Sequence, residues 1–277
     1  MAIQWPLVLY TLFTGLGVGA FAFVAVTEWL GKAERSRQPG AITALVALAL
    51  GGVASLFHLG HPERFFNALV NLSSSIAQEM ILTGLTALVI LIYVILVQIG
   101  FSAQGRKIVA TIGLVLAVIL AIVLGNSYVQ PSRPAWNTFL LPLLYLTSAS
   151  VMGLFIGYLW TAVRKEETTI VMSVNKATLI ALAIQTVTIV AYVIYLVVAP
   201  EASPARLLGA DLALAFWGGV VVVGLVIPLG LTAWLFTSKK EAPPFFTMAS
   251  VGLVCVLVGG IVTRTLLFHL GSSVALF

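Results

Sequence analysis

Charged residues are scarce in this 277-residue chain: Asp, Glu, Lys and Arg together make up 8% of it, whereas 61% of the residues are hydrophobic. Soluble domains carry about 25% charged residues. The composition therefore excludes a soluble enzyme, a disordered tail and a nucleic-acid-binding protein. Apolar runs of about 20 residues recur along the chain, and helices of that length cross the apolar core of a bilayer. The sequence thus predicts an all-α, polytopic membrane protein.

Cysteine and histidine are also rare, with one and three residues in the whole chain. The lone Cys255 excludes an internal disulfide bond and an iron–sulfur cluster held by this chain. Three histidines are too few for the four axial ligands of two haems. We expect no metal centre on this chain, although a single b-type haem between His58 and His269 stays open as an alternative.

Polar breaks divide the chain into eight predicted spans, each about 19–26 residues long and able to cross an apolar core about 30 Å thick. They cover approximately residues 6–30, 40–58, 76–99, 108–128, 138–163, 177–199, 212–237 and 245–270. The first nine residues hold no basic residue, which a cleavable signal peptide needs, so we expect the first span to be retained. The connections are short, and residues 1–277 are predicted to form one integral membrane domain.

Basic residues are distributed unequally between the two sides of the predicted bundle. The first, third, fifth and seventh loops hold ten Lys and Arg residues, whereas the opposite side, including the last helix, holds Arg64, Arg133, Arg206 and Arg264. Short cytoplasmic loops carry an excess of basic residues. The sequence therefore places both termini outside, on the periplasmic side of a bacterial-type inner membrane.

Ionisable groups inside membrane spans are costly, and each is a candidate for function. Five lie in the predicted spans: Glu28, His58, Glu79, Arg264 and His269. Glu28 lies near the inner end of its span, where we interpret it as a side chain that reaches the membrane interface. The other four share one layer near the outer face. At 1.5 Å per residue, Glu79 lies about 6 Å and Arg264 about 10 Å from the outer ends of their helices.

One shallow polar layer in an apolar bundle favours an amphipathic redox lipid over a transported ion, which needs polar groups at the midplane. A quinol head group needs an acceptor for each hydroxyl proton, and a carboxylate or a neutral imidazole can serve.

Structural interpretations of the same residues stay open. Ser75 and Gln78 have the spacing of a helix-capping box, beside which Glu79 is also favoured by the helix dipole. Arg264 can pair with Glu79 or Asp211, and His58 and His269 can be interfacial residues.

The loop after the second span has a more specific pattern. It reads His-Leu-Gly-His-Pro-Glu-Arg-Phe-Phe-Asn from residue 58 to 67, and Ser-Ser-Ser-Ile-Ala-Gln-Glu follows at 73–79. This pattern resembles the DmsC family, the membrane-anchor subunits of dimethyl sulfoxide reductase-type molybdenum oxidoreductases. Pro134-Ala135-Trp136, Arg264, the length and the eight spans also fit, so the resemblance covers the whole chain. His61 departs from it, because the family has a small residue there.

The resemblance implies partners and site residues. Such subunits anchor a molybdopterin catalytic subunit and a four-cluster iron–sulfur subunit, and they oxidise menaquinol without a haem. The family's quinol-site residues map onto His58 and Glu79. We expect Glu79 to accept a proton and His58 to act as a hydrogen-bond partner or second acceptor, and Arg264 is expected to contribute to quinol binding. The expected docking residues for the iron–sulfur subunit are His61, Arg64, Arg133 and Trp136.

The sequence therefore predicts the quinol-oxidising anchor subunit of a multi-subunit oxidoreductase, with the quinol near the outer face. We expect it to contact membrane lipid and its two protein partners, and we expect no nucleic-acid partner. Family members also serve sulfite-oxidising enzymes, in which electrons run toward quinone, so the direction of electron flow stays open. A secondary transporter is the rival from another class.

Overall fold

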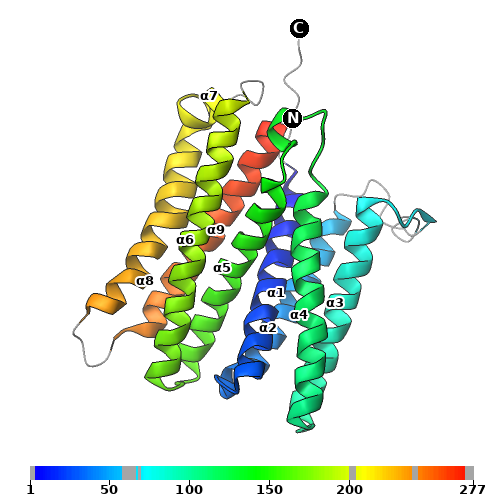
Figure 1. Ribbon diagram of the computed structural model, residues 1–277, viewed down its shortest axis with the longest axis vertical. Coiled ribbons are helices and arrows are strands. Elements are labelled where there is room, and N and C mark those ends of the chain that lie inside the picture. The colour runs from blue at the N-terminus through cyan, green and yellow to red at the C-terminus, as the bar shows by residue number, and fades with distance from the viewer. Residues whose placement is uncertain (1–3, 58–66, 68–69, 200–203, 239–242, 272–277) are drawn as a thin grey trace.

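The structure is a computed structural model that describes residues 4–57, 67, 70–199, 204–238 and 243–271. Within these ranges all regular secondary structure is helical, and eight helices are long and apolar enough to cross a membrane. The predicted all-α, eight-span architecture is therefore confirmed (Figure 1).

The helices follow one another along the sequence in this order. They are α1 (Trp5–Leu30), α2 (Glu34–Leu56), α3 (Ser75–Gln98), α4 (Ala103–Asn126), the 3₁₀ turn η2 (Pro134–Trp136), α5 (Leu140–Val163), α6 (Thr168–Val198), the short α7 (Pro204–Leu208), the π-helix η4 (Ala215–Val226), α8 (Ile227–Thr237) and α9 (Phe245–Gly271). The helices η4 and α8 are joined without a break and form one span.

Three spans begin earlier than the polar breaks indicated. Helix α2 begins at Glu34 rather than near residue 40, α4 at Ala103 rather than near residue 108, and α6 at Thr168 rather than near residue 177. Each extra segment contains a polar residue that is buried or partly buried and bonded within the bundle. Asn175 of α6, for example, donates from Nδ2 to the carbonyl oxygen of Thr232 in α8 at 3.0 Å. Hydropathy alone therefore predicts too short a helix where residues of other helices satisfy the polar groups at its end.

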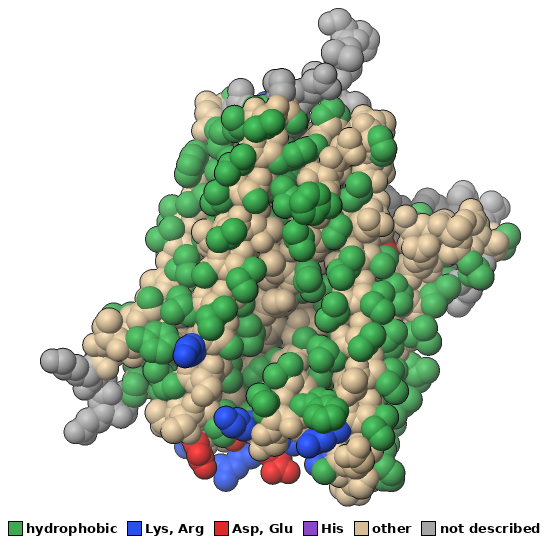
Figure 2. Space-filling model, in the orientation of Figure 1, with side chains coloured by type: hydrophobic (Ala, Val, Ile, Leu, Met, Phe, Trp, Pro, Cys, Tyr) green, Lys and Arg blue, Asp and Glu red, His purple; other side chains and the backbone are tan. Residues whose placement is uncertain are grey.

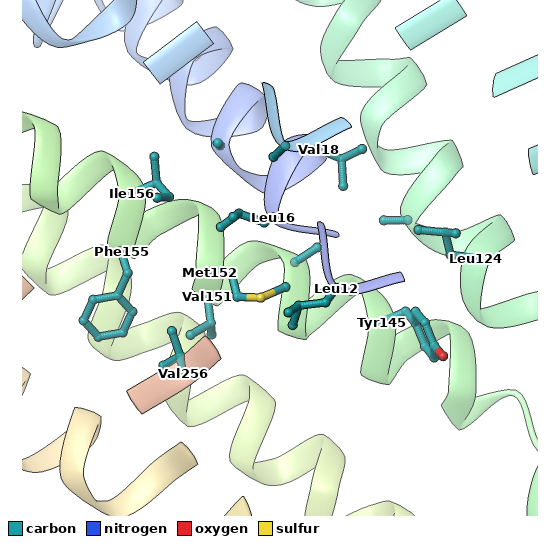
Figure 3. Packing of buried hydrophobic residues seen from close by; sticks show 14 of the residues in the cluster. Leu12, Leu16, Val18, Leu124, Tyr145, Val151, Met152, Phe155, Ile156 and Val256 are labelled. Carbon is teal, nitrogen blue, oxygen red and sulfur yellow. The ribbon is translucent and has the colours of Figure 1, made fainter. Parts of the chain in front are cut away.

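Helix α1 lies at the centre of the packing and contacts α2, α4, α5 and α9. It crosses α5 at close range, because a Cβ added to Gly19 or to Gly153 would overlap the backbone of the other helix. Small residues at helix crossings allow this approach in membranes. Figure 3 shows buried apolar side chains around these helices, where Leu12 and Leu16 of α1 lie beside Met152 of α5.

The two ends of the bundle differ in charge. We call the end where α1 begins and α9 ends the Glu79 end, and the opposite end the Glu28 end. In Figure 2, the Lys and Arg side chains on the visible face gather toward the Glu28 end, at the bottom of the view. The eight described basic residues of the first, third and fifth predicted loops lie toward this end. The orientation of the bundle in a membrane stays a prediction.

Candidate functional site

Glu79 lies one turn into α3, at the point where three segments converge. The helix is capped by Ser74, whose Oγ accepts a hydrogen bond from the backbone N of Ala77 at 3.2 Å. The alternative of a capping box at Ser75 and Gln78 is therefore wrong, because the N-cap is Ser74 and the residue three positions later, Ala77, has no side-chain acceptor to complete a box. The carboxyl group of Glu79 instead interacts with the hydroxyl groups of Tyr10 in α1 and Ser127 after α4. Its side chain thus joins α3 to two other segments and does not cap its own helix.

Arg264 of α9 is buried, with an exposed fraction of 2%. Its guanidinium group donates to Thr11 Oγ1 at 3.1 Å and to the Thr11 carbonyl oxygen at 3.3 Å, both in α1. It also donates to Ser148 Oγ of α5 at 3.4 Å and to the Gly260 carbonyl oxygen of its own helix at 3.1 Å. These hydroxyl and carbonyl oxygens hold the side chain in one orientation.

Among the described residues, Arg264 forms no ion pair. The alternative that it pairs with Glu79 or Asp211 is therefore wrong for this structure, and Asp211 pairs instead with Arg206 at 2.8 Å. That pair lies beyond the membrane-spanning helices, where the Arg206 guanidinium holds the pKa of the Asp211 carboxyl below its usual value. A buried arginine without a carboxylate partner is unusual, because burying a charge is costly unless it is paired.

Two tyrosines interact with both Glu79 and Arg264. The ring of Tyr145 faces the Arg264 guanidinium, 5.3 Å from its carbon atom to the ring centroid, and Tyr145 also interacts with Thr11. Tyr128 stacks on Tyr145, with ring centroids 5.8 Å apart and ring planes at 18°. Both phenol groups interact electrostatically with Glu79 and with Arg264. The carboxylate and the guanidinium thus belong to one polar layer, although they do not touch.

The loop between α4 and α5 covers this layer from the Glu79 end. Trp136 is buried, with 5% exposure, and its Nε1 donates to the Leu267 carbonyl oxygen of α9 at 2.7 Å. Tyr192 of α6 donates to the Ala135 carbonyl oxygen at 2.9 Å. Trp136 therefore fixes the loop to the bundle, and its side chain is not part of the exposed surface. Arg133 is partly exposed and lies over the Trp136 ring, 4.5 Å from its centroid.

The opposite end holds a second buried charge cluster, around Glu28. Glu28 is 2% exposed and accepts from Arg37 Nη1 at 2.9 Å, from Arg106 Nε at 3.2 Å and from the Tyr93 hydroxyl at 2.8 Å. The interpretation of Glu28 as an interfacial side chain is therefore wrong. Arginines from α2 and α4 reach back into the bundle, so that the carboxylate does not need to reach the interface.

An apolar layer separates the two clusters. Thr11 and Glu28 lie 17 positions apart on α1, which corresponds to about 25 Å along the helix. The α1 residues between Gly15 and Val26 are uncharged, and buried ones such as Val18 and Phe21 belong to the hydrophobic core. In the described residues Glu28 and its partners therefore lie near one end of the bundle, and Glu79 and Arg264 lie near the other.

Comparison with known proteins identifies the family. The family described as "Polysulphide reductase, NrfD" matches residues 1–274 of the chain. The chain belongs to the NrfD family. It is 22% identical to the C subunit of the anaerobic dimethyl sulfoxide reductase of Escherichia coli, over 99% of this chain and 96% of that protein. It is 25% identical to the C subunit of the polysulfide reductase of Wolinella succinogenes, over 98% of this chain and 94% of that protein.

A third relative of this NrfD-family protein matches over a shorter length. The C subunit of the anaerobic dimethyl sulfoxide reductase of Haemophilus influenzae is 27% identical over 56% of this chain and 57% of that protein. The resemblance to the DmsC family that the loop motif indicated is confirmed by these matches. The family thus agrees with the sequence pattern, whereas the role of each residue is a separate question.

Several predicted residues of this NrfD-family protein lie outside the described part of the structure. His58, His61 and Arg64 are among them, so their predicted roles stay predictions. Of the other predicted site residues, Glu79 and Arg264 fall in one layer, and Trp136 with Arg133 lies in the loop above it. The described residues contain no group of three or more His, Cys, Asp or Glu side chains suited to a metal ion.

Sequence reasoning missed the uncharged half of the site. Tyr10, Thr11, Ser127, Tyr145 and Ser148 come from three different segments and have no common motif. A weak signal exists in α1, where Tyr10 and Thr11 interrupt an apolar run near the same end as Glu79. Only the packing of α1 against α3 and α5 shows that these hydroxyl groups meet the two charged side chains.

Proposed function

We propose that this protein is the membrane-anchor subunit of a molybdopterin oxidoreductase complex and that it oxidises quinol, with menaquinol as the expected species, at the Glu79 end. The NrfD family and the names of the relatives, which are C subunits of dimethyl sulfoxide and polysulfide reductases, support an anchor in a reductase complex. The observation that carries the proposal is the polar layer in which Glu79 and the unpaired Arg264 lie close to one end of an apolar bundle.

The layer offers complementary groups to a quinol head. A carboxylate beside the Tyr10 and Ser127 hydroxyls can accept a proton from a quinol hydroxyl, and these hydroxyls keep it in position. The fixed guanidinium of Arg264 supplies positive charge in a dry environment, where it stabilises the negative charge that develops on the head-group oxygen as the proton leaves. Glu79 is therefore the proposed proton acceptor and Arg264 the proposed electrostatic partner.

Oxidation of one quinol releases two protons and two electrons. We assign one proton to Glu79 and, on the resemblance, the other to His58. The electrons pass to the iron–sulfur partner subunit, which docks at the Glu79 end near Arg133 and near Arg64 of the preceding loop. The same residues serve the reverse reaction, so an anchor that reduces quinone for a sulfite-oxidising enzyme is the alternative direction.

The side of the membrane follows from the distribution of charge. The basic Glu28 end is proposed to face the cytoplasm, which places both termini and the quinol site at the periplasmic side of the bacterial inner membrane. Because an apolar layer of about 25 Å separates the two charge clusters, we propose that both quinol protons leave on the Glu79 side and that turnover moves no charge across the membrane. A transporter would need polar groups in that layer.

The test of the proposed function is Glu79→Gln in the assembled complex. The amide is nearly isosteric and keeps hydrogen bonding, yet it cannot accept a proton at neutral pH. Quinol-linked activity should fall by about two orders of magnitude, the scale of a lost general base, while reduction of the partners by an artificial dye stays normal. Gln78→Ala, at the exposed neighbouring position, is the matched control and should keep its quinol activity. Quinol activity near wild type in Glu79→Gln would refute the assignment.

The side is tested by labelling single cysteines in a Cys255→Ala background. Exposed positions at the two ends are Asn137 and Glu34. An impermeant maleimide added to intact spheroplasts without the partner subunits should label Asn137→Cys and leave Glu34→Cys unlabelled. The reverse pattern would invert the proposed topology and move the partners to the cytoplasm.

A further inference from the structure

Two adjoining pockets lie between α5, α6, α9 and η4, and Tyr145 and Arg264 of the polar layer line one of them. The first has ≈ 270 Å³ of space free of atoms, part of it open to the surroundings, and is lined by Tyr145, Ser148, Gln185 and Arg264 among others. The second has ≈ 350 Å³ of such space and is bounded by apolar residues that include Phe216 and Val220 of η4. They share the lining residues Leu144, Ile189, Thr263 and Leu267, so a polar part and an apolar part adjoin each other.

The polar part presents an acceptor without a donor. The Oε1 atom of Gln185 is buried and has no hydrogen-bond partner within the described structure. An unsatisfied buried acceptor costs about 1–3 kcal/mol, so such a group commonly marks a place that a ligand or a water occupies. Arg264 and Ser148, which supply donors, line the same pocket. Donors and a free acceptor in one small space match the carbonyl and hydroxyl oxygens of a quinone or quinol head.

The polar part is also the deeper part. Ser148 lies one helical turn beyond Leu144 on α5, and Gln185 lies one turn before Ile189 on α6, in both cases toward the Glu28 end. The apolar part, with Leu207 and Leu270, lies nearer to the Glu79 end. A phospholipid keeps its charged head at the membrane surface and its acyl tails deep, which is the opposite order. An amphiphile that enters with an uncharged head first has the order that this space requires.

The apolar part lies between two pairs of packed helices, α5 with α6 and α9 with η4. Helix α6 packs against α5 and α8, whereas η4 packs against α9, where Gly224 and Gly259 bring the two backbones close together. Residues next to the pocket on both walls face outward: Val190 is 51% exposed and Trp217 is 51% exposed. The π-helical turns of η4 form one wall, and π-helical turns occur frequently at functional sites.

We propose that this space binds a second quinone molecule, with its head against Gln185 and Arg264 and its isoprenoid tail leaving between α6 and η4. The class of ligand rests on the proposed function; the location does not. Arg264 then stands between two head groups, one on the Glu79 side and one on the Gln185 side. Its head is held by α6 and α9, whereas Glu79 is on α3, which packs mainly against α4 and α2, so the second molecule is a bound reserve rather than the molecule that transfers its protons to that carboxylate.

The proposal is tested with a photoreactive azidoquinone in the purified complex, followed by identification of the labelled peptides. Label is expected in two groups of peptides, one from α1 and α3 around Tyr10 and Glu79, the other from α6 and α9 around Gln185 and Thr263. Two variants address the second group separately: Gln185→Leu removes the acceptor without adding volume, and Val220→Trp fills the apolar part. Val222→Trp is the matched control, because Val222 lies on the same helix and is 47% exposed.

Label in the α6 and α9 peptides should fall about fivefold or more in Gln185→Leu and Val220→Trp, as expected for the loss of one buried hydrogen bond or of the tail pocket. It should persist in Val222→Trp, and label around Glu79 should persist in all three. Label confined to the α1 and α3 peptides would overturn the second site and leave the proposed function intact. Label confined to α6 and α9 would support the second site and overturn the Glu79 site. Recovery of a phospholipid that only Val220→Trp removes would also overturn the proposal.

Discussion

Buried charge is paired at the Glu28 end of the bundle and unpaired at the Glu79 end. At the Glu28 end one carboxylate accepts from two arginines and a tyrosine, and four helices, α1 to α4, contribute to the cluster. At the Glu79 end a carboxylate and a guanidinium lie in the same layer, yet each is bound only by uncharged groups among the described residues. The first arrangement favours a fixed structure, and the second leaves charge available to a ligand.

The contrast between the two ends distinguishes buried charges that stabilise the fold from buried charges that act in function. Removing one partner from a buried pair leaves the other charge uncompensated, which is strongly destabilising. Removing a buried charge that has no ionic partner leaves no opposite charge behind. Substitutions at the two ends should therefore differ in kind: loss of stability at the Glu28 end and loss of activity at the Glu79 end.

The greatest effect is expected for Glu28→Gln. The change leaves Arg37 and Arg106 without their shared counter-charge, and the free energy of unfolding should fall by about 3–5 kcal/mol. Thermal unfolding of the purified complex in detergent, together with the amount assembled in membranes, measures it. Glu34→Gln, at an exposed position of the same end, is the control and should change stability little. A Glu28→Gln complex as stable as wild type would show that the pairing contributes nothing to the fold.

Arg264→Met is expected to lower activity rather than stability, and its effect in free energy should be smaller than that of Glu28→Gln. Methionine fills a similar volume and removes a buried, unpaired charge, so stability should stay near wild type. Quinol-linked activity per assembled complex should fall about 100-fold, or about 2.7 kcal/mol of transition-state stabilisation. Arg206→Met, which breaks the exposed pair with Asp211, is the control and should keep its activity. Strong destabilisation with normal specific activity would show that Arg264 stabilises the fold and does not act in the reaction.

The sequence was sufficient for the architecture because hydropathy and helix length decide it. Eight apolar runs became eight spans, and the errors lie at ends such as Glu34, where polar residues continue the helix inside the bundle. The error on Glu28 has the same cause. Whether a carboxylate near a helix end reaches the interface or stays buried depends on which arginines fold back to meet it, and here these come from α2 and α4.

The candidate site was predictable only in its charged members. Glu79 and Arg264 stand out because ionisable residues are rare in membrane spans. Tyr10, Ser127 and Tyr145 are uncharged at neutral pH, and many polar residues in this protein bond only to their own helix, as Thr186 does to the Leu182 carbonyl oxygen. Their role depends on which side chain of another helix they face, and no local pattern records that.

A modest effect is expected for the hydroxyl group of Tyr10, which tests whether neutral groups hold the charge at the Glu79 end. Tyr10→Phe removes a hydroxyl that interacts with the Glu79 carboxyl group and leaves the ring in place. One such hydrogen bond contributes about 1 kcal/mol, so kcat for quinol oxidation should fall about fivefold. Because the carboxylate itself remains, the loss should be well below that of Glu79→Gln, and the dye-linked activity should not change.

Tyr158→Phe provides the matched control for this change. Tyr158 lies in α5, is fully buried, and its hydroxyl has no hydrogen-bond partner in the described structure, so the same substitution there removes an oxygen without breaking a bond. Steady-state kinetics with a soluble quinol analogue should therefore separate the two variants. If both variants lose activity equally, the loss is a general effect of changing a buried tyrosine. A loss confined to Tyr10→Phe would show that it comes from the hydroxyl beside Glu79. In the latter case the neutral groups around Glu79 act on the reaction through the position of its carboxylate.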